Sequence, residues 1–254
     1  MNRDNKKKIT AIIECRMTST RLPGKVMLTS CGKTMLEHIA ERLSTVKAID
    51  TILFATTANA TDDCIAALAE KIGVQCFRGD EEDVLKRVLL AAEACKTDII
   101  VEITGDCPLI DPSIVAQTID LYMYNECDYA SNDLKPSFPL GMDVQVFSRD
   151  LLRIADEKGL TAPDREHVSW YFIRNPDQFR LVTLPAPPPL YAPTVRLTLD
   201  ETNDYLLIDS VFNALYEKYP CFNLYDIMAY LKAHPEVAAL NAHIVQRHPS
   251  QNEE

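Results

Sequence analysis

Four cations stand close together near the start of the chain, and they are the residues most able to hold a charged ligand. They are Arg16, Arg21, Lys25 and Lys33, and no acidic residue lies between the first and the last of them. This local excess occurs in a chain of 254 residues whose formal net charge is −11. Cations beside free backbone N–H groups suit a polyanion, most simply a triphosphate. A solvated basic loop is the alternative, and the charges alone favour neither.

Two aspartates could complete a site for phosphate transfer. Asp106 follows the apolar run 98–103, and Asp200 follows the apolar run 195–199. Magnesium binds few protein carboxylates and leaves its other positions to phosphate oxygens and water, so one well-placed aspartate makes half of such a site. Each aspartate also has a plainer interpretation, Asp106 as a turn former and Asp200 as the N-cap of a helix.

The surrounding elements predict how these residues are positioned. The cationic stretch joins an apolar strand at 9–13 to a helix over 34–43, whose apolar residues recur at helical spacing. Further strands are predicted at 51–56, 74–77, 98–103 and 195–199, and helices at 61–72 (capped by Asn59 or Thr61), 84–95, 149–157 and 202–219.

This alternation of strands and helices is typical of an α/β fold, a mostly parallel sheet with helices on both faces. Ligands bind such sheets at the carboxyl ends of the strands. We therefore expect Asp106 and Asp200 to lie in one cleft that faces residues 16–25. The side chains of Arg21 and Lys25 should be exposed toward this cleft.

The region from 128 to about 193 differs in character from the rest. A helix that starts at Ala162 is predicted to carry Trp170 and Tyr171, which we expect to pack in the core. Apolar content stays high throughout, so no domain linker is predicted. The prolines between 185 and 193 are expected to stiffen an extended connection.

The ordered motif Arg16-x-x-Ser19-x-Arg21-Leu22-Pro23-Gly24-Lys25, placed after an apolar strand, resembles the signature of the CTP-dependent sugar-acid cytidylyltransferases. This family includes the acylneuraminate and 3-deoxy-manno-octulosonate enzymes, and the chain is most similar to its SpsF branch of spore coat polysaccharide proteins. The resemblance covers residues 9 to about 219. It implies a Rossmann-like three-layer α/β/α nucleotidyltransferase fold of the GT-A-like type.

The resemblance also implies a reaction and its residues. CTP and a sugar acid of the nonulosonic or ulosonic type would give a CMP-sugar and pyrophosphate for surface polysaccharide or glycan biosynthesis. The implied metal is Mg²⁺, for which Mn²⁺ could substitute, held by Asp106 and Asp200. The implied catalytic residues are Arg16, Lys25 and Asp106, and the implied CTP-binding residues are Arg16, Ser19, Arg21, Gly24, Lys25 and Thr104.

The expected organisation is a flexible tail at 1–8, one cytidylyltransferase domain at 9–248 and a disordered tail at 249–254. By resemblance, residues 128–193 form an insertion that helps to build the sugar pocket and the contact of a homodimer.

Some positions depart from the family pattern. Gln145 stands where the SpsF branch is expected to have Glu, which leaves its role open. Thr198 stands where the acylneuraminate enzymes have a further Asp, so the chain is closer to the octulosonate arrangement. Arg165, Glu166 and His167 resemble a Glu-His pair near the sugar site, but a solvated helix turn explains them equally well.

The composition excludes several classes of partner. An acidic balance argues against general binding of nucleic acid or of anionic membranes. No apolar stretch approaches the length of a membrane span, and no signal-peptide core follows the N-terminus. The eight cysteines are scattered without metal-ligand spacing, which indicates reduced thiols, no structural zinc and a cytoplasmic location.

Three alternatives to the sugar-acid enzyme remain. The first is a nucleotidyltransferase of the same fold that acts on a sugar phosphate, phosphonate or polyol phosphate. The second is a nucleotide-sugar glycosyltransferase, which usually carries an Asp-x-Asp motif that this sequence lacks. The third is a non-catalytic binding module, which is disfavoured because the cationic stretch and both aspartates are present.

Overall fold

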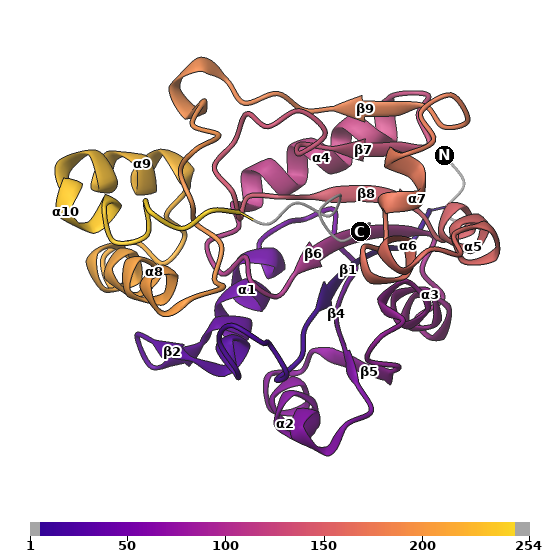
Figure 1. Ribbon diagram of the computed structural model, residues 1–254, viewed down its shortest axis with the longest axis horizontal. Coiled ribbons are helices and arrows are strands. Elements are labelled where there is room, and N and C mark those ends of the chain that lie inside the picture. The colour runs from indigo at the N-terminus through magenta and orange to yellow at the C-terminus, as the bar shows by residue number, and fades with distance from the viewer. Residues whose placement is uncertain (1–5, 247–254) are drawn as a thin grey trace.

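Seven strands form one mixed sheet in the computed structural model, which describes residues 6–246 (Figure 1). The order across the sheet is β5-β4-β1-β6-β8-β7-β9, and among these strands β8 runs antiparallel to both neighbours. The predicted mostly parallel α/β sheet is therefore confirmed. The bounds are β1 Ile9–Glu14, β4 Thr51–Thr57, β5 Gln75–Gly79, β6 Ile99–Thr104, β7 Tyr129–Ser131, β8 Gln145–Ser148 and β9 Leu181–Thr183, with a separate hairpin of β2 Thr29–Ser30 and β3 Lys33–Thr34.

Helices cover both faces of the sheet. One face carries α1, α2, α4, α8 and α9, and the other carries α3, α5 and the short helices α6 and α7. The helix bounds are α1 Met35–Ser44, α2 Asp63–Ile72, α3 Val84–Ala94, α4 Pro112–Tyr124, α5 Arg149–Lys158, α6 Ala162–Glu166, α7 Trp170–Ile173, α8 Thr202–Leu215, α9 Leu224–Ala233 and α10 Pro235–Ala238, and the 3-10 turns are η2 Lys25–Met27, η3 Ala60–Asp62 and η4 Pro188–Leu190.

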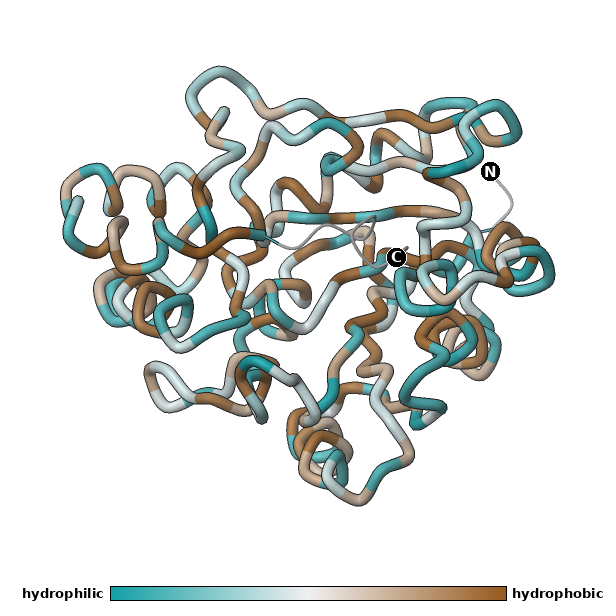
Figure 2. The backbone as a smooth tube through the Cα atoms, viewed as in Figure 1, coloured by the Kyte–Doolittle hydropathy of each residue, from teal (hydrophilic) through white to brown (hydrophobic). Residues whose placement is uncertain are grey.

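Two apolar cores, one on each face, hold these layers together. The register partners Ile13 and Ile103 lie in the core under α1, and Ile12 and Ile100 of the same two strands lie in the core under α3. Strands that are covered on both faces have to be apolar almost throughout, which explains the near-continuous hydrophobic runs of β1 and β6. Hydrophobic and hydrophilic residues alternate around helices such as α2, which places one side against the sheet (Figure 2).

The helix starts follow capping chemistry that the sequence partly shows. The side chains of Asp83, Asp111 and Ser148 cap α3, α4 and α5, because each accepts a backbone N–H group of the first turn of its helix. The predicted cap of the second helix is wrong. Within η3 and α2, neither Asn59 nor the residues after it provides a side-chain cap bond, because α2 continues directly from a 3-10 turn.

The predicted strand at 195–199 is wrong, and the difference matters for the site. This segment makes an isolated bridge between Arg196 and Leu140 instead of joining the sheet. Its backbone N–H groups bond to two loops, Leu197 to the carbonyl of Leu140 at 2.8 Å and Leu199 to the carbonyl of Asp106 at 2.8 Å. Gly141 permits this approach, since it has φ +92 and an added Cβ would lie 2.7 Å from the nitrogen of Thr198.

Two predicted helices have different bounds. The helix from Ala162 is broken into α6 and α7, because His167 leaves helical conformation at φ −113 and ψ 87. The helix predicted over 202–219 ends at Leu215. Of the two aromatic residues on α7, Tyr171 is buried and Trp170 is half-buried.

The tails predicted at 1–8 and 249–254 lie largely outside the described residues, which exclude 1–5 and 247–254. Lys8, the last residue of the predicted N-terminal tail, is held at both ends. Its backbone N–H donates to Oδ2 of Asp98 at 2.7 Å, and its Nζ donates to the carbonyl of Cys95 at 2.6 Å.

Candidate active site

A cleft of about 510 Å³ opens where β1 and β6 end, and most of the predicted site residues line it. The loop after β1, the turn after β6 and the segment before α8 each contribute to its wall. The predicted residues that line this cleft are Arg16, Ser19, Arg21, Lys25, Thr104, Asp106 and Asp200. The expectation that both aspartates share one cleft with the cationic stretch is confirmed.

Gly24 contributes to the cleft through the backbone of the loop. It has φ +71, a left-handed conformation that favours glycine, and its N–H donates to the carbonyl of Met17 at 2.8 Å. This bond closes the loop on itself. Lys25 then begins the turn η2, so that its side chain is directed toward the aspartates.

Lys25 joins the two aspartates. Its Nζ lies 3.2 Å from Oδ2 of Asp106 and 2.8 Å from Oδ1 of Asp200. Burial by itself lowers the pKa of Lys25, but the charges of Asp106 and Asp200 outweigh it and raise this pKa above its ordinary value. The expectation that Lys25 and Arg21 are exposed is wrong: their side chains are 13% and 26% exposed, because the carboxylates draw them inward.

Asp106 is held as an anion by its neighbours. Burial favours the neutral acid, but Lys25 and a 2.6 Å hydrogen bond from the hydroxyl of Thr104 lower the pKa of Asp106 below its ordinary value. The role of Thr104 in the structure is therefore to orient a carboxylate oxygen. An aspartate that stays ionised at neutral pH is suited to binding a cation.

Asp200 receives cations from two separate segments. Its Oδ1 lies 3.0 Å from Nη2 of Arg21 as well as 2.8 Å from Lys25, and its Oδ2 lies 2.7 Å from Nη2 of Arg196. Its side chain is only 6% exposed. It reaches the cleft on the irregular segment that binds to the backbone of Asp106, and not at the end of a strand as predicted.

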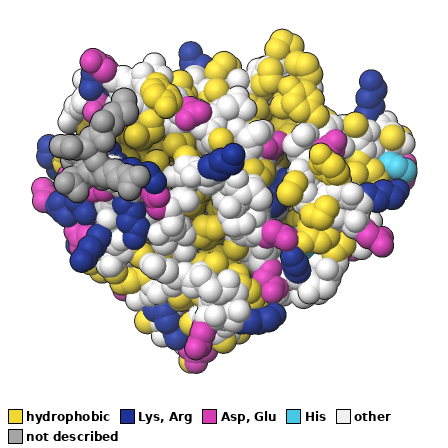
Figure 3. All heavy atoms as spheres, turned by 180° about the vertical axis from the view of Figure 1, so that it is seen from behind, with side chains coloured by type: hydrophobic (Ala, Val, Ile, Leu, Met, Phe, Trp, Pro, Cys, Tyr) yellow, Lys and Arg dark blue, Asp and Glu magenta, His cyan; other side chains and the backbone are white. Residues whose placement is uncertain are grey.

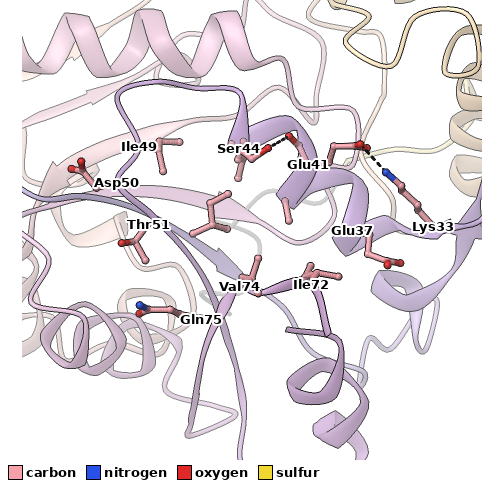
Figure 4. A pocket seen from close by; sticks show the side chains of 14 residues that line it. Lys33, Glu37, Glu41, Ser44, Ile49, Asp50, Thr51, Ile72, Val74 and Gln75 are labelled. Carbon is pink, nitrogen blue, oxygen red and sulfur yellow. Dashed lines mark hydrogen bonds and ion pairs between the residues drawn. The ribbon is translucent and has the colours of Figure 1, made fainter. Parts of the chain in front are cut away.

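The other two cations of the stretch lie elsewhere. Arg16 is turned toward Glu81, with Nη1 at 3.3 Å from the carboxylate, although it still lines the cleft. Lys33 donates to Glu41 at 2.7 Å and to the hydroxyl of Tyr216 at 2.8 Å. It lines a separate hollow of about 620 Å³ between α1 and the strands β4 and β5 (Figure 4).

A group of acids that the sequence did not single out lies in and behind the same cleft. Burial raises the pKa of Glu14 to about 6, and burial with the charge of Asp133 raises that of Asp143 to about 7. Burial and the charge of Glu14 raise the pKa of Glu102 well above its ordinary value. Among the described residues, Oε1 of Glu14 and Oε2 of Glu102 have no hydrogen-bond partner.

Gln145 lies beside this group of acids. It is the register partner of Glu102 on β8, and its Nε2 donates to Oδ2 of Asp133 at 2.7 Å. The amide thus supplies a donor where the glutamate expected in this branch would add a further carboxyl group. This gives a structural reason for the departure that the sequence left open.

The three residues of the predicted Glu-His region divide between two roles. Arg165 binds Asp83 and Asp156 with charged contacts of 2.5 and 2.8 Å, so it ties α6 to neighbouring elements. Glu166 and His167 line the cleft. Burial lowers the pKa of His167, which favours a neutral imidazole.

Sequence reasoning missed several residues of the cleft, notably Arg87, Asp143 and Gln246. Arg87 is 2% exposed and donates to the backbone carbonyls of Ala55 and Glu81. The sequence feature that could have revealed it is a cation in the middle of an apolar helix face. Asp143 lies between the apolar residues Met142 and Val144, an alternation that is typical of a half-exposed strand and gave no functional signal. Gln246 had no signal in the sequence.

The rest of the described surface limits other interpretations. Seen from behind, Lys and Arg side chains are interspersed with Asp and Glu over most of the face (Figure 3). No helix within residues 6–246 combines the length and the hydrophobicity that a membrane crossing requires. In the same range, no group of three or more His, Cys, Asp or Glu side chains is arranged to hold a metal ion.

A family model described as cytidylyltransferase matches residues 10–218 of the chain. Among known proteins, the spore coat polysaccharide biosynthesis protein SpsF of Bacillus subtilis is 33% identical over 235 residues, covering 91% of this chain and 96% of that protein. The 3-deoxy-manno-octulosonate cytidylyltransferase of Solibacter usitatus is 35% identical over 131 residues, which is 51% of this chain and 50% of that enzyme.

A solved structure of a cytidylyltransferase from Leptospira borgpetersenii has the same architecture. It superposes with a TM-score of 0.88 at 32% identity, covering 96% of this chain and 100% of that one. The family model thus spans the chain from the first strand of the sheet to beyond the segment that carries Asp200.

Proposed function

The chain belongs to the cytidylyltransferase family, and from this premise we propose that it couples CTP to a sugar acid. In this reaction a hydroxyl oxygen of the sugar acid attacks the α-phosphorus of CTP. The bond from that phosphorus to the bridging oxygen breaks, pyrophosphate leaves with the electron pair, and the hydroxyl proton is released. The product is a CMP-sugar, which suits a role in polysaccharide biosynthesis of the kind named for SpsF.

The observation that carries this proposal is the meeting of Arg21 and Lys25 with Asp106 and Asp200 in one cleft. Nucleotidyl transfer needs charge neutralisation and positioning more than covalent help from the protein. The cations neutralise the triphosphate and the leaving pyrophosphate. The carboxylates supply the oxygen ligands that a phosphate-bound metal prefers.

The proposed contacts follow the predicted residues. Arg16 and Arg21 bind phosphate oxygens with forked guanidinium groups, and Lys25 makes a point contact. Ser19 and the loop backbone around Gly24 supply further donors. Thr104 acts through Asp106, whose carboxylate it orients.

The residues present fit Mg²⁺ or Mn²⁺. Oδ2 of Asp106 and Oδ1 of Asp200 both contact the single ammonium group of Lys25, so the two carboxylates converge on a space that one cation can fill. Asp106 and Asp200 would hold the metal and would leave its other ligand positions to phosphate oxygens and water. When bound, the metal would neutralise charge on the α-phosphate. A consequence for this chain is that Lys25 exchanges its aspartate contacts for phosphate contacts.

The same proposal includes a homodimer and a cytoplasmic enzyme, both of which rest on the family resemblance. The alternative acceptors for an enzyme of the same fold are a sugar phosphate, a phosphonate or a polyol phosphate. We place the acceptor beside Asp143, Glu166 and His167, which line the same cleft as Asp106.

The test is a turnover assay with purified full-length protein. Pyrophosphate release is measured with CTP, UTP, ATP or GTP, each combined with 3-deoxy-manno-octulosonate, N-acetylneuraminate or a sugar phosphate. We expect release with CTP and a sugar acid, loss of activity with EDTA, and recovery with Mg²⁺ or Mn²⁺. Release with sugar phosphates alone would contradict the acceptor class, and full activity in EDTA would contradict the metal.

A thermal-shift series supports the assay without knowledge of the acceptor. A nucleotide that binds the folded state raises the melting temperature, by an amount that grows with the logarithm of its concentration relative to its dissociation constant. We expect the largest shift with CTP plus Mg²⁺, and an equal shift with all four nucleotides would contradict the choice of cytosine.

A further inference from the structure

The two carboxylate oxygens of Asp200 have different surroundings. Oδ1 faces the cleft, where Lys25 and Arg21 lie within 2.8 and 3.0 Å. Oδ2 faces the interior, where it accepts a hydrogen bond from Nη2 of Arg196 at 2.7 Å. A carboxylate that can rotate would present either oxygen, and the contact with Arg196 removes that freedom.

Arg196 is itself held rigidly. It is 4% exposed, and its Nε and Nη2 donate to the two oxygens of Asp204 at 2.9 and 3.0 Å. Its Nη1 donates to the side chain of Gln246, and its carbonyl accepts from Nδ2 of Asn241 at 3.0 Å. A planar guanidinium group whose position is fixed by these hydrogen bonds can fix the orientation of a neighbouring carboxylate.

Asp204 completes the arrangement from the first turn of α8. Its Oδ2 accepts the backbone N–H groups of Asp200 and Glu201, each at 3.0 Å. The same side chain therefore fixes both the backbone of Asp200 and the arginine that orients its side chain. Because Asp204 also balances one positive charge of Arg196, the arginine can bind Asp200 without adding a net charge to the cleft.

We propose that Arg196 is a positioning residue that locks Asp200 with Oδ1 toward the cleft and thereby sets the affinity of the site for a divalent cation. This inference rests on the proposed function, in which Asp200 is a metal ligand. Partners that orient a metal ligand from behind typically change metal affinity by 10- to 100-fold when they are replaced.

The experiment measures Mn²⁺ binding to the full-length protein with CTP present, by titration of the free-ion electron paramagnetic resonance signal. Arg196→Lys keeps the charge but loses the fork that spans Asp200 and Asp204. We expect its dissociation constant for Mn²⁺ to rise by about 10- to 100-fold, with little change in CTP affinity measured without metal.

Arg42→Lys is the matched control. Arg42 is also 4% exposed, but its Nε and Nη2 donate to the backbone carbonyls of Ile110 and Phe222 at 2.6 and 2.8 Å, away from the cleft. This substitution should lower the melting temperature and leave Mn²⁺ affinity as in the wild type. An equal loss of Mn²⁺ affinity in both lysine variants would overturn the proposal, because general destabilisation would then explain it.

The remaining outcomes separate this inference from the proposed function. If the wild type binds Mn²⁺ with CTP and Arg196→Lys binds it equally well, the inference fails and the function stands. If the wild type binds no Mn²⁺ with CTP, the proposed metal role fails together with the inference. Should Arg196→Lys not fold, Asp204→Asn and the surface variant Gln246→Ala, each of which loosens Arg196, are titrated in the same way. Unchanged affinity in both overturns the proposal.

Discussion

The acidic residues in and behind the cleft differ in their partners, and we call Asp106 and Asp200 the cation-paired side and Glu14, Glu102 and Asp143 the acid-paired side. Asp106 and Asp200 meet cations, and the pKa of Asp106 is lowered although burial opposes its ionisation. Burial, together with neighbouring carboxyl groups, raises the pKa values of Glu14, Glu102 and Asp143, to about 6 for Glu14 and about 7 for Asp143. Carboxyl groups are thus kept ionised on the cation-paired side, whereas the neutral form is favoured on the acid-paired side.

Burial favours the neutral acid on both sides, so the difference lies in whether cations outweigh it, as Lys25 does at Asp106. The ionised side suits phosphates and a metal ion, both of which need fixed charges. On the acid-paired side the pKa values of Glu14 and Asp143 are about 6 and about 7, so these acids can donate as well as accept hydrogen bonds. The tests below change one side at a time.

Removing charge from the cation-paired side should have the largest effect. Asp106→Asn and Asp200→Asn should each reduce kcat by about a hundredfold or more, because a catalytic metal supplies several kcal/mol. The double variant should be little worse than either single one, since residues that act as a unit are not additive. Steady-state turnover at limiting Mg²⁺ measures this. Asp63→Asn, at an exposed site paired with Arg78, is the control.

Full turnover by either single variant at limiting Mg²⁺ would remove the shared metal site. CTP binding without metal should survive in all three variants, because the cations hold the phosphates.

Removing the cations should have the next largest effect. Lys25→Ala and Arg21→Ala should each lose a charge-assisted contact worth about 1.5–3 kcal/mol, which is roughly a 10- to 150-fold loss in kcat/KM for CTP. Lys33→Ala is the matched control, because Lys33 comes from the same stretch but lines the separate hollow. A loss with Lys33→Ala as large as that with Lys25→Ala would show that only general positive charge matters.

On the acid-paired side the expected effect is on stability and depends on pH. The pKa of Glu14 is raised from 4.5 to about 6, so between these pH values the folded protein keeps a proton that the unfolded chain loses. The free energy of unfolding therefore falls as pH rises through this window, by about 2 kcal/mol in total. Asp106 has the opposite sign, because its lowered pKa contributes stability that is lost only as pH falls below its ordinary range.

Glu14→Gln tests this pH dependence. The difference in unfolding free energy, variant minus wild type, should be about 2 kcal/mol more favourable to the variant at pH 8 than at pH 4, as measured by urea unfolding. Glu126→Gln, at a side chain that is 95% exposed, should show no such trend. A pH-independent difference between Glu14→Gln and wild type would contradict the raised pKa.

The smallest expected effect comes from adding a carboxyl group to the acid-paired side. Gln145→Glu replaces the donor to Asp133 with a further acid beside Glu102, and should cost about 1 kcal/mol of unfolding free energy at pH 8. The cost should shrink at pH 4, where the acids are protonated. An equal cost in unfolding free energy, relative to the wild type, at both pH values would mean that water solvates the added charge at this site.

Several parts of the site were predictable from the sequence because their signals are local. The cationic stretch, the turn that holds Gly24 and the aspartate after β6 all follow from short motifs and from the position of a strand end. The sheet with its two helical layers followed from alternating apolar runs. The strand predicted at 195–199 failed because an apolar run shows that a segment is buried, but not which backbone groups it bonds.

What the sequence by itself determined is the family motif, the fold class and the identity of the residues that line the cation-paired side. Only the tertiary structure decided that Lys25 contacts Asp106 and Asp200, which lie 81 and 175 positions further along the chain. It also decided that Arg196 holds one oxygen of Asp200, and that Glu14 and Glu102 lie beside other acids. The physical reason is that charge and burial act through space, so the proton affinity of a side chain depends on neighbours that the local sequence does not contain.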